Sequence, residues 1–388
     1  MRITQALSAA AFSLCIASGA HAADDLKIGF VLPMSGPHAS YGLQILNGAK
    51  LYVQQHGDTV AGRKVTFLVK DDTGVAPEIS KRAAQELVNR DKVDILAGFG
   101  LTPSAFAVAP LSASAKIPMI VMNAATSSVT TKSPYLLRTS MTLPQNSAPM
   151  AKWAIKNGIK NVYTLAADYG PGHDAEKQFI KTFTEEGGKI VGEVRTPVKN
   201  PDFSPYLQKI KDAKPDAIFM FVPSGEQGVA FLKGYADRGL KEAGIKLIAT
   251  GDLTDEDVLD AMGDPALGLI TSFHYSDAHD SALNKQYTEA YAKAYPGVRP
   301  NFMSVAGYDG MHLVYEALKK TNGDASGDKF LDAAKGLKWE SPRGPISIDP
   351  ETRDIVQDIY IRKVERRNGR LENVEFDVIP NFKDPGKE

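Results

Sequence analysis

The first residues suited to holding a ligand form a short loop that precedes a predicted helix. The loop is Pro33-Met34-Ser35-Gly36-Pro37-His38-Ala39-Ser40-Tyr41-Gly42, and it follows the apolar run Leu26–Leu32. Its glycines and prolines favour a turn. The free N–H groups and the dipole of a helix N-terminus attract anions. The loop therefore predicts contact with a negatively charged group.

Motifs that would indicate an enzyme are missing from the sequence. There is no H-E-x-x-H, no G-x-S-x-G and no P-loop. Gly98-Phe99-Gly100 begins a dinucleotide-type G-x-G, but Pro103 stands where the third glycine belongs. His38 and His173 lie in predicted loops without a positioned partner, which is more typical of surface histidines. We therefore predict no enzymatic activity, no cofactor and no metal site.

Short apolar strands alternate with amphipathic helices in two series, separated by a break at residues 138–148. The predicted strands cover 26–32, 65–69, 93–98 and 117–121, then 161–166, 190–194, 216–222 and 246–250. The predicted helices cover 42–55, 79–89 and 104–115, then 148–157, 172–186, 203–213 and 226–238. This alternation predicts an α/β fold with two open parallel sheets. Ligands of such sheets lie beyond the carboxyl ends of the strands, and two facing sheets place the best pocket between them.

The N-terminus has the pattern of an export signal. Met1-Arg2 precedes the apolar stretch Ile3–Gly19 and the cleavage signature Ala20-His21-Ala22, so residues 1–22 are predicted to be a signal peptide for the periplasm. The apolar stretch is shorter than the about 20 residues that span a membrane. The single cysteine, Cys15, lies inside this segment, so a mature chain would have no disulfide. With 45 basic and 46 acidic residues, the charge balance argues against nucleic acid as a partner.

Further short motifs follow the first loop in a fixed order. They are S-G-P-x-x-x-Y-G at Ser35–Gly42, Asn47-Gly48-Ala49, Lys70-Asp71-Asp72, Asn123-Ala124-Ala125-Thr126 and Asp168-Tyr169-Gly170. In this series the chain resembles type I periplasmic binding proteins of the leucine/isoleucine/valine family, and the resemblance runs through essentially the whole mature chain. It implies two Rossmann-like open-sheet lobes, joined by three hinge crossings, that close on a ligand like a Venus flytrap.

The resemblance also implies where the chain passes between the lobes. The crossings fall near Arg138-Thr139, Ser272-Phe273 and Asp349-Pro350. Lobe 1 would comprise residues 24–138 and 273–349, and lobe 2 residues 139–272 and 350–380, with a tail at 381–388. Short crossings of this kind are natural hinges, because a few backbone torsions can close the lobes.

One end of the implied site holds a carboxylate. The resemblance assigns this role to hydroxyls and backbone N–H groups in the loop Gly100–Ser104 and the turn Ala124–Thr126, with Ala124 and Thr126 as contacts. A buried carboxylate needs such bonds, and each contributes about 1.5–3 kcal/mol. Pro103 stands near the family's main serine position, so either Thr102 or Ser104 can supply the hydroxyl.

The other end of the implied site contains an acid. Tyr41 and Tyr169 match positions that contact the ligand from opposite lobes, and Asp252 matches the residue that pairs with the ammonium group of an amino acid. Ser224 replaces part of a bulkier aromatic loop, and Met303 falls near an aromatic position. Because Met adapts its shape, these two replacements predict a roomier pocket.

These features predict a monomeric solute-binding protein that serves the membrane permease of an ABC importer. The ligand is a small carboxylate, in the first instance a branched-chain or other hydrophobic amino acid, because an unpaired buried Asp252 would be costly. A protonated or solvated Asp252 would instead suit aromatic carboxylates or 2-oxo acids. A sensory ligand-binding module of the same fold is the other alternative.

Overall fold

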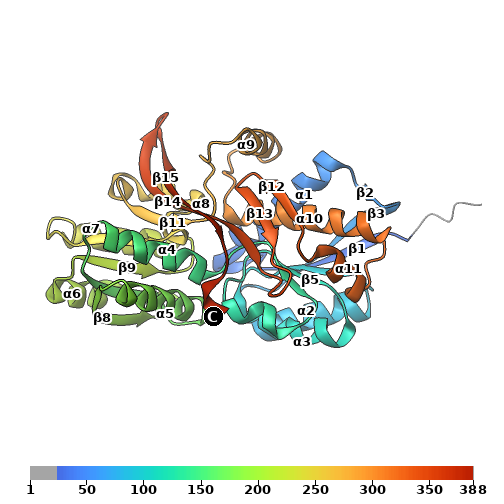
Figure 1. Ribbon diagram of the computed structural model, residues 1–388, viewed down its shortest axis with the longest axis horizontal. Helices are drawn as coiled ribbons and strands as arrows, with labels where there is room; N and C mark the ends of the chain where they lie inside the picture. The colour runs from blue at the N-terminus through green and yellow to red at the C-terminus, as the bar shows by residue number, and fades with distance from the viewer. Residues whose placement is uncertain (1–23, 388) are drawn as a thin grey trace, which may run out of the picture.

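The computed structural model describes residues 24–387, and the predicted signal peptide lies outside the described residues. The smaller of its two sheets has six strands (Figure 1). Their order is β2 (Thr59–Val60), β3 (Arg63–Asp71), β1 (Leu26–Leu32), β4 (Ile95–Gly98), β5 (Met119–Val121) and β6 (Leu136–Arg138). All neighbours in this sheet run parallel except the short β2–β3 pair.

Helices from two distant parts of the chain accompany the smaller sheet. They are α1 (Ala39–His56), α2 (Pro77–Asn89) and α3 (Thr102–Ala115), then α9 (Ala282–Ala294), α10 (Phe302–Thr321) and α11 (Gly327–Ala334). Helix α10 packs along α1, so the later segment returns to the first one. We call this sheet with these helices lobe 1.

The larger sheet has nine strands. The order is β12 (Lys338–Ser341), β13 (Gly344–Ile348), β14 (Ile355–Arg367), β11 (Ile270–Phe273), β10 (Lys246–Thr250), β9 (Ala217–Phe221), β7 (Asn161–Ala167) and β8 (Lys189–Thr196), and β15 (Arg370–Phe382) pairs with β14. Its helices are α4 (Leu143–Lys156), α5 (Gly170–Glu185), α6 (Ser204–Ala213), α7 (Glu226–Asp237) and α8 (Glu256–Met262). We call this sheet with these helices lobe 2; the long β14–β15 ribbon extends from its upper side in Figure 1.

The α/β class and the two open sheets are confirmed, and each predicted strand is present with small shifts at its ends. The helix predicted over 148–157 begins earlier, at Leu143, because Thr142 and Gln145 form a capping box. The strands β2, β6 and β11 and the antiparallel additions β12 to β15 were not predicted. The lobe boundaries stay a prediction, and β12 and β13, which lie in the segment assigned to lobe 1, hydrogen-bond at the edge of the larger sheet.

Three completely buried arginines lie where the chain passes between the lobes. Arg138, Arg343 and Arg362 are at most 1 % exposed. Arg138 Nε donates to Asp354 at 2.6 Å, and the Arg343 guanidinium lies 2.9 Å from Asp309. A buried charge is tolerated when it is paired and hydrogen-bonded. The arginines therefore fix the crossing segments to both sheets.

Removing one member of the Arg138–Asp354 pair should destabilise the whole protein. Asp354→Ala leaves a buried guanidinium without its carboxylate, and we expect a loss of about 3–5 kcal/mol in the free energy of unfolding, measured by urea denaturation. Asp332→Ala is the matched control, because Asp332 is 78 % exposed in its pair with Lys335 and should change the midpoint little. Equal effects of the two variants would contradict the proposed role of the buried pair.

Candidate ligand site between the lobes

A narrow cleft lies where the carboxyl ends of the strands of both sheets face each other. Lobe 1 contributes the loops that follow β1, β4 and β5, and lobe 2 those that follow β7, β9 and β10. The residues that line it are Tyr41, Gly100, Leu101, Thr102, Asn123, Ala124, Ala125, Met141, Leu143, Tyr169, Pro171, Phe221, Pro223, Asp252 and Phe302. The cavity has a volume of only ≈ 20 Å³, enough for about one water molecule. The lobes are therefore in a closed conformation.

One end of the cleft combines two hydroxyl groups with two helix N-termini. The Oγ atoms of Thr102 and Thr126 lie 3.0 Å apart. Helix α3 begins at Thr102 and α5 begins at Gly170, and neither helix has a side-chain cap. A Cβ on Gly170 would lie 2.8 Å from the Thr126 hydroxyl, so glycine permits the close approach of the lobes. Uncapped helix N-termini beside hydroxyl donors can bind a carboxylate.

Buried polar contacts fix the turn that follows β5. Arg138 donates to the carbonyl of Ala124 at 2.9 Å, and Asn123 Nδ2 donates to the carbonyl of Gly100 at 2.7 Å. Within the turn, the Ala124 N–H donates to the Phe99 carbonyl at 3.0 Å and the Thr126 N–H lies 3.4 Å from the Thr102 Oγ. These bonds hold the turn against the loop that follows β4. The hinge arginine thus also positions the candidate carboxylate site.

Lobe 2 contributes an acidic side chain to the cleft. Asp252 is 6 % exposed and accepts a hydrogen bond from the Thr250 hydroxyl at 2.8 Å. Burial raises the pKa of Asp252 to about 7, while the Thr250 bond lowers it. Arg362 Nη2 donates to the Gly251 carbonyl at 3.4 Å and holds the loop. Near neutral pH, Asp252 can therefore be protonated or ionised, and in both forms it can accept a hydrogen bond.

Aromatic rings from both lobes form part of the cleft walls. Tyr169 and Phe221 stack with their planes 19° apart and their centroids at 6.2 Å. On the other side, Phe302 packs edge-on against Phe273 at 4.8 Å. Flat apolar walls together with a hydroxyl and an acid in the lining suit a planar amphipathic ligand better than a branched aliphatic one.

Most of the predicted ligand residues meet in this cleft. Tyr41, Thr102, Ala124, Tyr169 and Asp252 line it. Thr126 lies directly beside Thr102 and faces Gly170 of lobe 2. Contact with a ligand stays a prediction for all of them.

The other three predicted residues do not line the cleft. The Ser104 hydroxyl donates to the Gly74 carbonyl at 3.3 Å and lies 2.9 Å from the Ser80 hydroxyl, so of the two alternatives only Thr102 faces the cleft. The Ser224 hydroxyl bonds to Asp255. Met303 is fully buried, and its neighbour Phe302 lines the cleft instead. On a helix, one residue along the chain turns the side chain by about 100°, which explains the displacement.

Sequence reasoning missed several lining residues. Phe221 lies near the carboxyl end of the predicted strand 216–222 and Pro223 directly follows it, and this position was an available signal. Met141 and Leu143 lie in the break at 138–148. The sequence around Met141 and Leu143 gives no sign of a ligand site, because these residues reach the cleft only through the close approach of the lobes.

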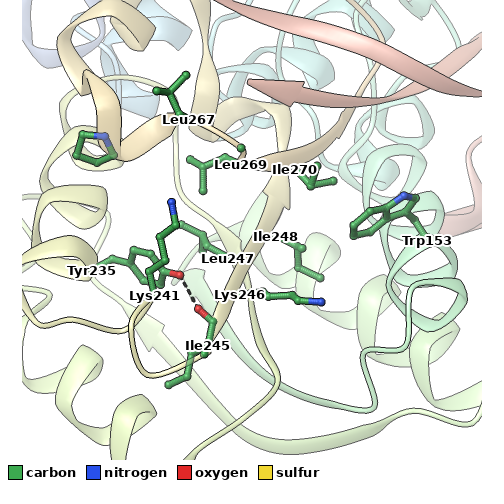
Figure 2. Close-up of a pocket in the computed structure, with 13 residues that line it drawn as sticks. Trp153, Tyr235, Lys241, Ile245, Lys246, Leu247, Ile248, Leu267, Leu269 and Ile270 are labelled. Atoms are coloured by element: carbon green, nitrogen blue, oxygen red, sulfur yellow. Dashed lines mark hydrogen bonds between the residues drawn. The ribbon is translucent and has the colours of Figure 1, made fainter. Parts of the chain in front are cut away.

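A larger cavity of ≈ 490 Å³ lies elsewhere on lobe 2, beside β10 and β11 (Figure 2). Trp153, Ile248 and Ile270 are grouped on one side of it, with Lys246 pointing toward Trp153. It contains none of the predicted ligand residues. Its lining lacks the converging hydroxyls and helix N-termini of the interlobe cleft, so we place the ligand site in the cleft.

The described residues contain neither a helix suited to cross a membrane nor a side-chain cluster suited to a metal ion. Among the helices within residues 24–387, none has the length and apolar character needed to cross a bilayer. In the same range, no cluster of three or more His, Cys, Asp or Glu side chains is arranged to hold a metal ion.

Two open α/β sheets that face each other across a closed polar and aromatic cleft define a two-lobed binding protein. The chain belongs to the periplasmic binding protein family, which matches residues 25–370. It is 45% identical to Leu/Ile/Val-binding protein homolog 6 of Brucella melitensis biotype 1, over 98% of both chains. With this membership, the resemblance seen in the sequence motifs is confirmed.

Solved structures of similar proteins define the class further. A solute-binding protein of an ABC transporter from Rhodopseudomonas palustris BisB5, in complex with 3,4-dihydroxybenzoic acid, is 57% identical, with a TM-score of 0.91 over 94% of this chain and 99% of that chain. One from Rhodopseudomonas palustris HaA2, in complex with p-hydroxybenzoic acid, is 45% identical with the same TM-score and coverage. A leucine-binding protein from Thermotoga maritima is 24% identical with a TM-score of 0.80 over 92% of this chain and 99% of that chain, and it supports the fold alone. The protein is an ABC-transporter solute-binding protein.

The raised pKa of Asp252 predicts a pH-dependent stability. Unfolded aspartate has a pKa near 3.9, whereas burial raises that of Asp252 to about 7. Between these values the folded chain holds more protons than the unfolded chain, so stability is greatest at low pH and is lost as the pH rises toward about 7. Relative to wild type, Asp252→Asn should gain stability from pH 5 to pH 8, by at most about 1.4 kcal/mol per pH unit.

Urea denaturation of the ligand-free protein across this pH range measures the effect. Asp280→Asn is the control, because Asp280 is 90 % exposed and the Lys285 ammonium holds its pKa below the usual value. Its stability difference from wild type should not change between pH 5 and pH 8. A flat difference for Asp252→Asn would show that Asp252 is not desolvated in the folded protein.

Proposed function

We propose that the protein captures a hydroxylated aromatic monocarboxylate, such as 4-hydroxybenzoate or 3,4-dihydroxybenzoate, for an ABC importer. The observation that carries the proposal is a cleft lined by aromatic rings, by the Thr102 side chain of lobe 1 and by a protonatable acid, Asp252, of lobe 2. The two similar solute-binding proteins in complex with dihydroxybenzoic and hydroxybenzoic acids support it. We further propose that the protein acts in the periplasm as a monomer and delivers its ligand to a membrane permease.

The carboxylate of such a ligand would bind beside Thr102 and Thr126. These hydroxyls and the uncapped starts of α3 and α5 supply donors and a favourable dipole. The cost of burying one negative charge is offset when its oxygens are hydrogen-bonded. Thr102 and Thr126 belong to lobe 1 and Gly170 to lobe 2, so an anion at this point would hold the lobes together.

The ring hydroxyl would bind at Asp252. A phenol donates one hydrogen bond, and a carboxyl group accepts it whether protonated or ionised. An ammonium group, by contrast, needs an ionised partner. Because burial raises the pKa of Asp252 to about 7, the site accepts a neutral donor without first ionising the acid. Between the two ends, Tyr169, Phe221 and Phe302 would pack on the aromatic ring.

A hydrophobic amino acid is the second candidate ligand. It is favoured by the carboxyl group of Asp252, which an ammonium group could pair with, and by the Leu/Ile/Val-binding name of the Brucella melitensis relative. The two candidates differ in the group presented to Asp252, so that residue distinguishes them.

A ligand panel tests the proposal. Isothermal titration and thermal shift with 4-hydroxybenzoate, 3,4-dihydroxybenzoate, benzoate, leucine and phenylalanine should rank the two hydroxylated acids first. A saturating ligand raises the melting temperature by mass action.

Asp252→Asn keeps an oxygen acceptor, so a phenolic ligand should lose about tenfold in affinity, whereas an amino acid should lose roughly 100-fold or more. Binding of leucine alone would overturn the proposal in favour of the second candidate.

The carboxylate end is tested by a matched pair of hydroxyl deletions. Thr102→Val removes a hydroxyl that lines the cleft and keeps the shape of the side chain, so the Kd for 4-hydroxybenzoate should rise roughly 10- to 100-fold. Ser104→Ala removes the neighbouring hydroxyl that bonds to Gly74, and its Kd should match wild type. The opposite order would place the carboxylate on Ser104.

A further inference from the structure

The capping residues of two helices from opposite lobes are hydrogen-bonded to each other. Asn301 caps α10 of lobe 1, where its Oδ1 accepts from the N–H groups of Met303 and Ser304. Its Nδ2 donates across the interface to both carboxylate oxygens of Asp255, at 3.0 and 3.2 Å. Asp255 in turn caps α8 of lobe 2 and accepts from the Asp257 N–H at 3.3 Å. Closure of the lobes thus joins two helix N-termini by their caps.

A second contact reaches the same acidic turn from α1. Gln44 is 1 % exposed, and lobe 1 holds both ends of its amide. Its Oε1 accepts from the Tyr291 hydroxyl at 2.6 Å, and its Nε2 donates to the Arg299 carbonyl at 2.9 Å. The same Nε2 also donates to Asp257 of lobe 2 at 2.5 Å. The Gln44 amide is therefore oriented by its own lobe toward an acceptor on the other.

Arg299 and Tyr41 complete the interface. The Arg299 guanidinium makes two bonds to Asp277, at 3.0 and 3.1 Å, and also contacts Asp260 of α8 at 3.3 Å. The Tyr41 hydroxyl donates to the Ser224 carbonyl at 2.8 Å, and the Ser224 hydroxyl bonds to Asp255. Of all these side chains, only Tyr41 also lines the cleft.

We infer that Gln44, Arg299 and Asn301 of lobe 1 and Asp255, Asp257 and Asp260 of lobe 2 form a polar latch. The latch sets ligand affinity by stabilising the closed conformation, and its members do not touch the ligand. This inference rests on the proposed function to the extent that ligand binding is coupled to closure of the lobes. The measured Kd equals the intrinsic Kd divided by the fraction of binding-competent protein, so a contact made only in the closed state lowers it.

The latch is polar, which keeps closure reversible. Asp255 is 2 % exposed in the closed conformation, and removing a carboxylate from water opposes the hydrogen bonds that it gains. An apolar contact of the same size would have no such opposing cost. The desolvation cost offsets part of the gain, so the latch biases the lobes toward closure without locking them around a ligand that must be released.

The test removes the acceptors on lobe 2. Asp257→Ala/Asp260→Ala deletes the partners of Gln44 and Arg299 and leaves every cleft-lining residue in place. We expect the Kd for 4-hydroxybenzoate to rise about tenfold, mostly through faster dissociation, with the ranking of the ligand panel unchanged. Asp264→Ala is the matched control, since Asp264 is an exposed acid of lobe 2 that pairs with Arg366 of the same lobe.

A second readout does not depend on the identity of the ligand. Fluorophores on cysteines introduced at the exposed positions Lys50 of α1 and Lys233 of α7 report the closed fraction by single-molecule energy transfer. The double variant should show a smaller closed fraction than wild type and Asp264→Ala. An unchanged closed fraction together with an unchanged Kd overturns the latch. Failure of every aromatic acid to bind wild type overturns the proposed function instead, and a reduced closed fraction would still support the latch.

Discussion

Burial of three guanidinium groups is the constraint on which the geometry of the two lobes depends. A buried arginine must satisfy its donors within the protein. Arg138 does so with Asp354 and the carbonyls of Ala124, Met141 and Ser127. Arg343 bonds to the carbonyls of Thr139 and Ser140, and Arg362 to those of Tyr275 and Gly251. Some of these carbonyls belong to the crossing segments and others to the cleft loops. The three arginines therefore hold the crossing segments and the cleft loops in place together.

This sharing couples the hinge to the ligand site. Arg138 is hydrogen-bonded to the Ala124 turn, and Arg362 is hydrogen-bonded to the Gly251-Asp252 loop. Each loop therefore moves together with its lobe. Near the crossings, the closed arrangement leaves the Ser140 and Ser147 hydroxyls and both ring nitrogens of His274 buried without a protein partner. Such groups carry a desolvation cost. The closed arrangement therefore carries a desolvation cost at the crossings, and a similar cost falls on the Asn123 Oδ1 of the cleft.

The sequence predicts most of the parallel strands, because most are apolar runs between turn residues, but it misses the short strands β6 and β11. It does not reveal β12, β13 and β15, whose burial varies along the strand and whose pairing is antiparallel. The loop motifs identify Tyr41, Thr102, Tyr169 and Asp252, since position after a strand fixes where a side chain lies. They do not distinguish Phe302 from Met303, or show that Ser224 meets Tyr41, which lies 183 residues away. Such contacts arise only when the lobes are placed together.

Overall similarity does not by itself name the ligand of this chain. A Leu/Ile/Val-binding homologue and a structure in complex with p-hydroxybenzoic acid are each 45% identical to this chain. Identity at that level therefore fixes the fold and leaves the ligand open. A carboxylate site made of helix N-termini and hydroxyls is common to amino acids and aromatic acids. Discrimination between an amino acid and an aromatic acid must therefore come from the cleft walls and from Asp252. A site whose polar groups match one ligand leaves those groups unpaired when a different ligand binds. In this chain the walls are aromatic and the acid is protonatable, and both properties suit a phenol.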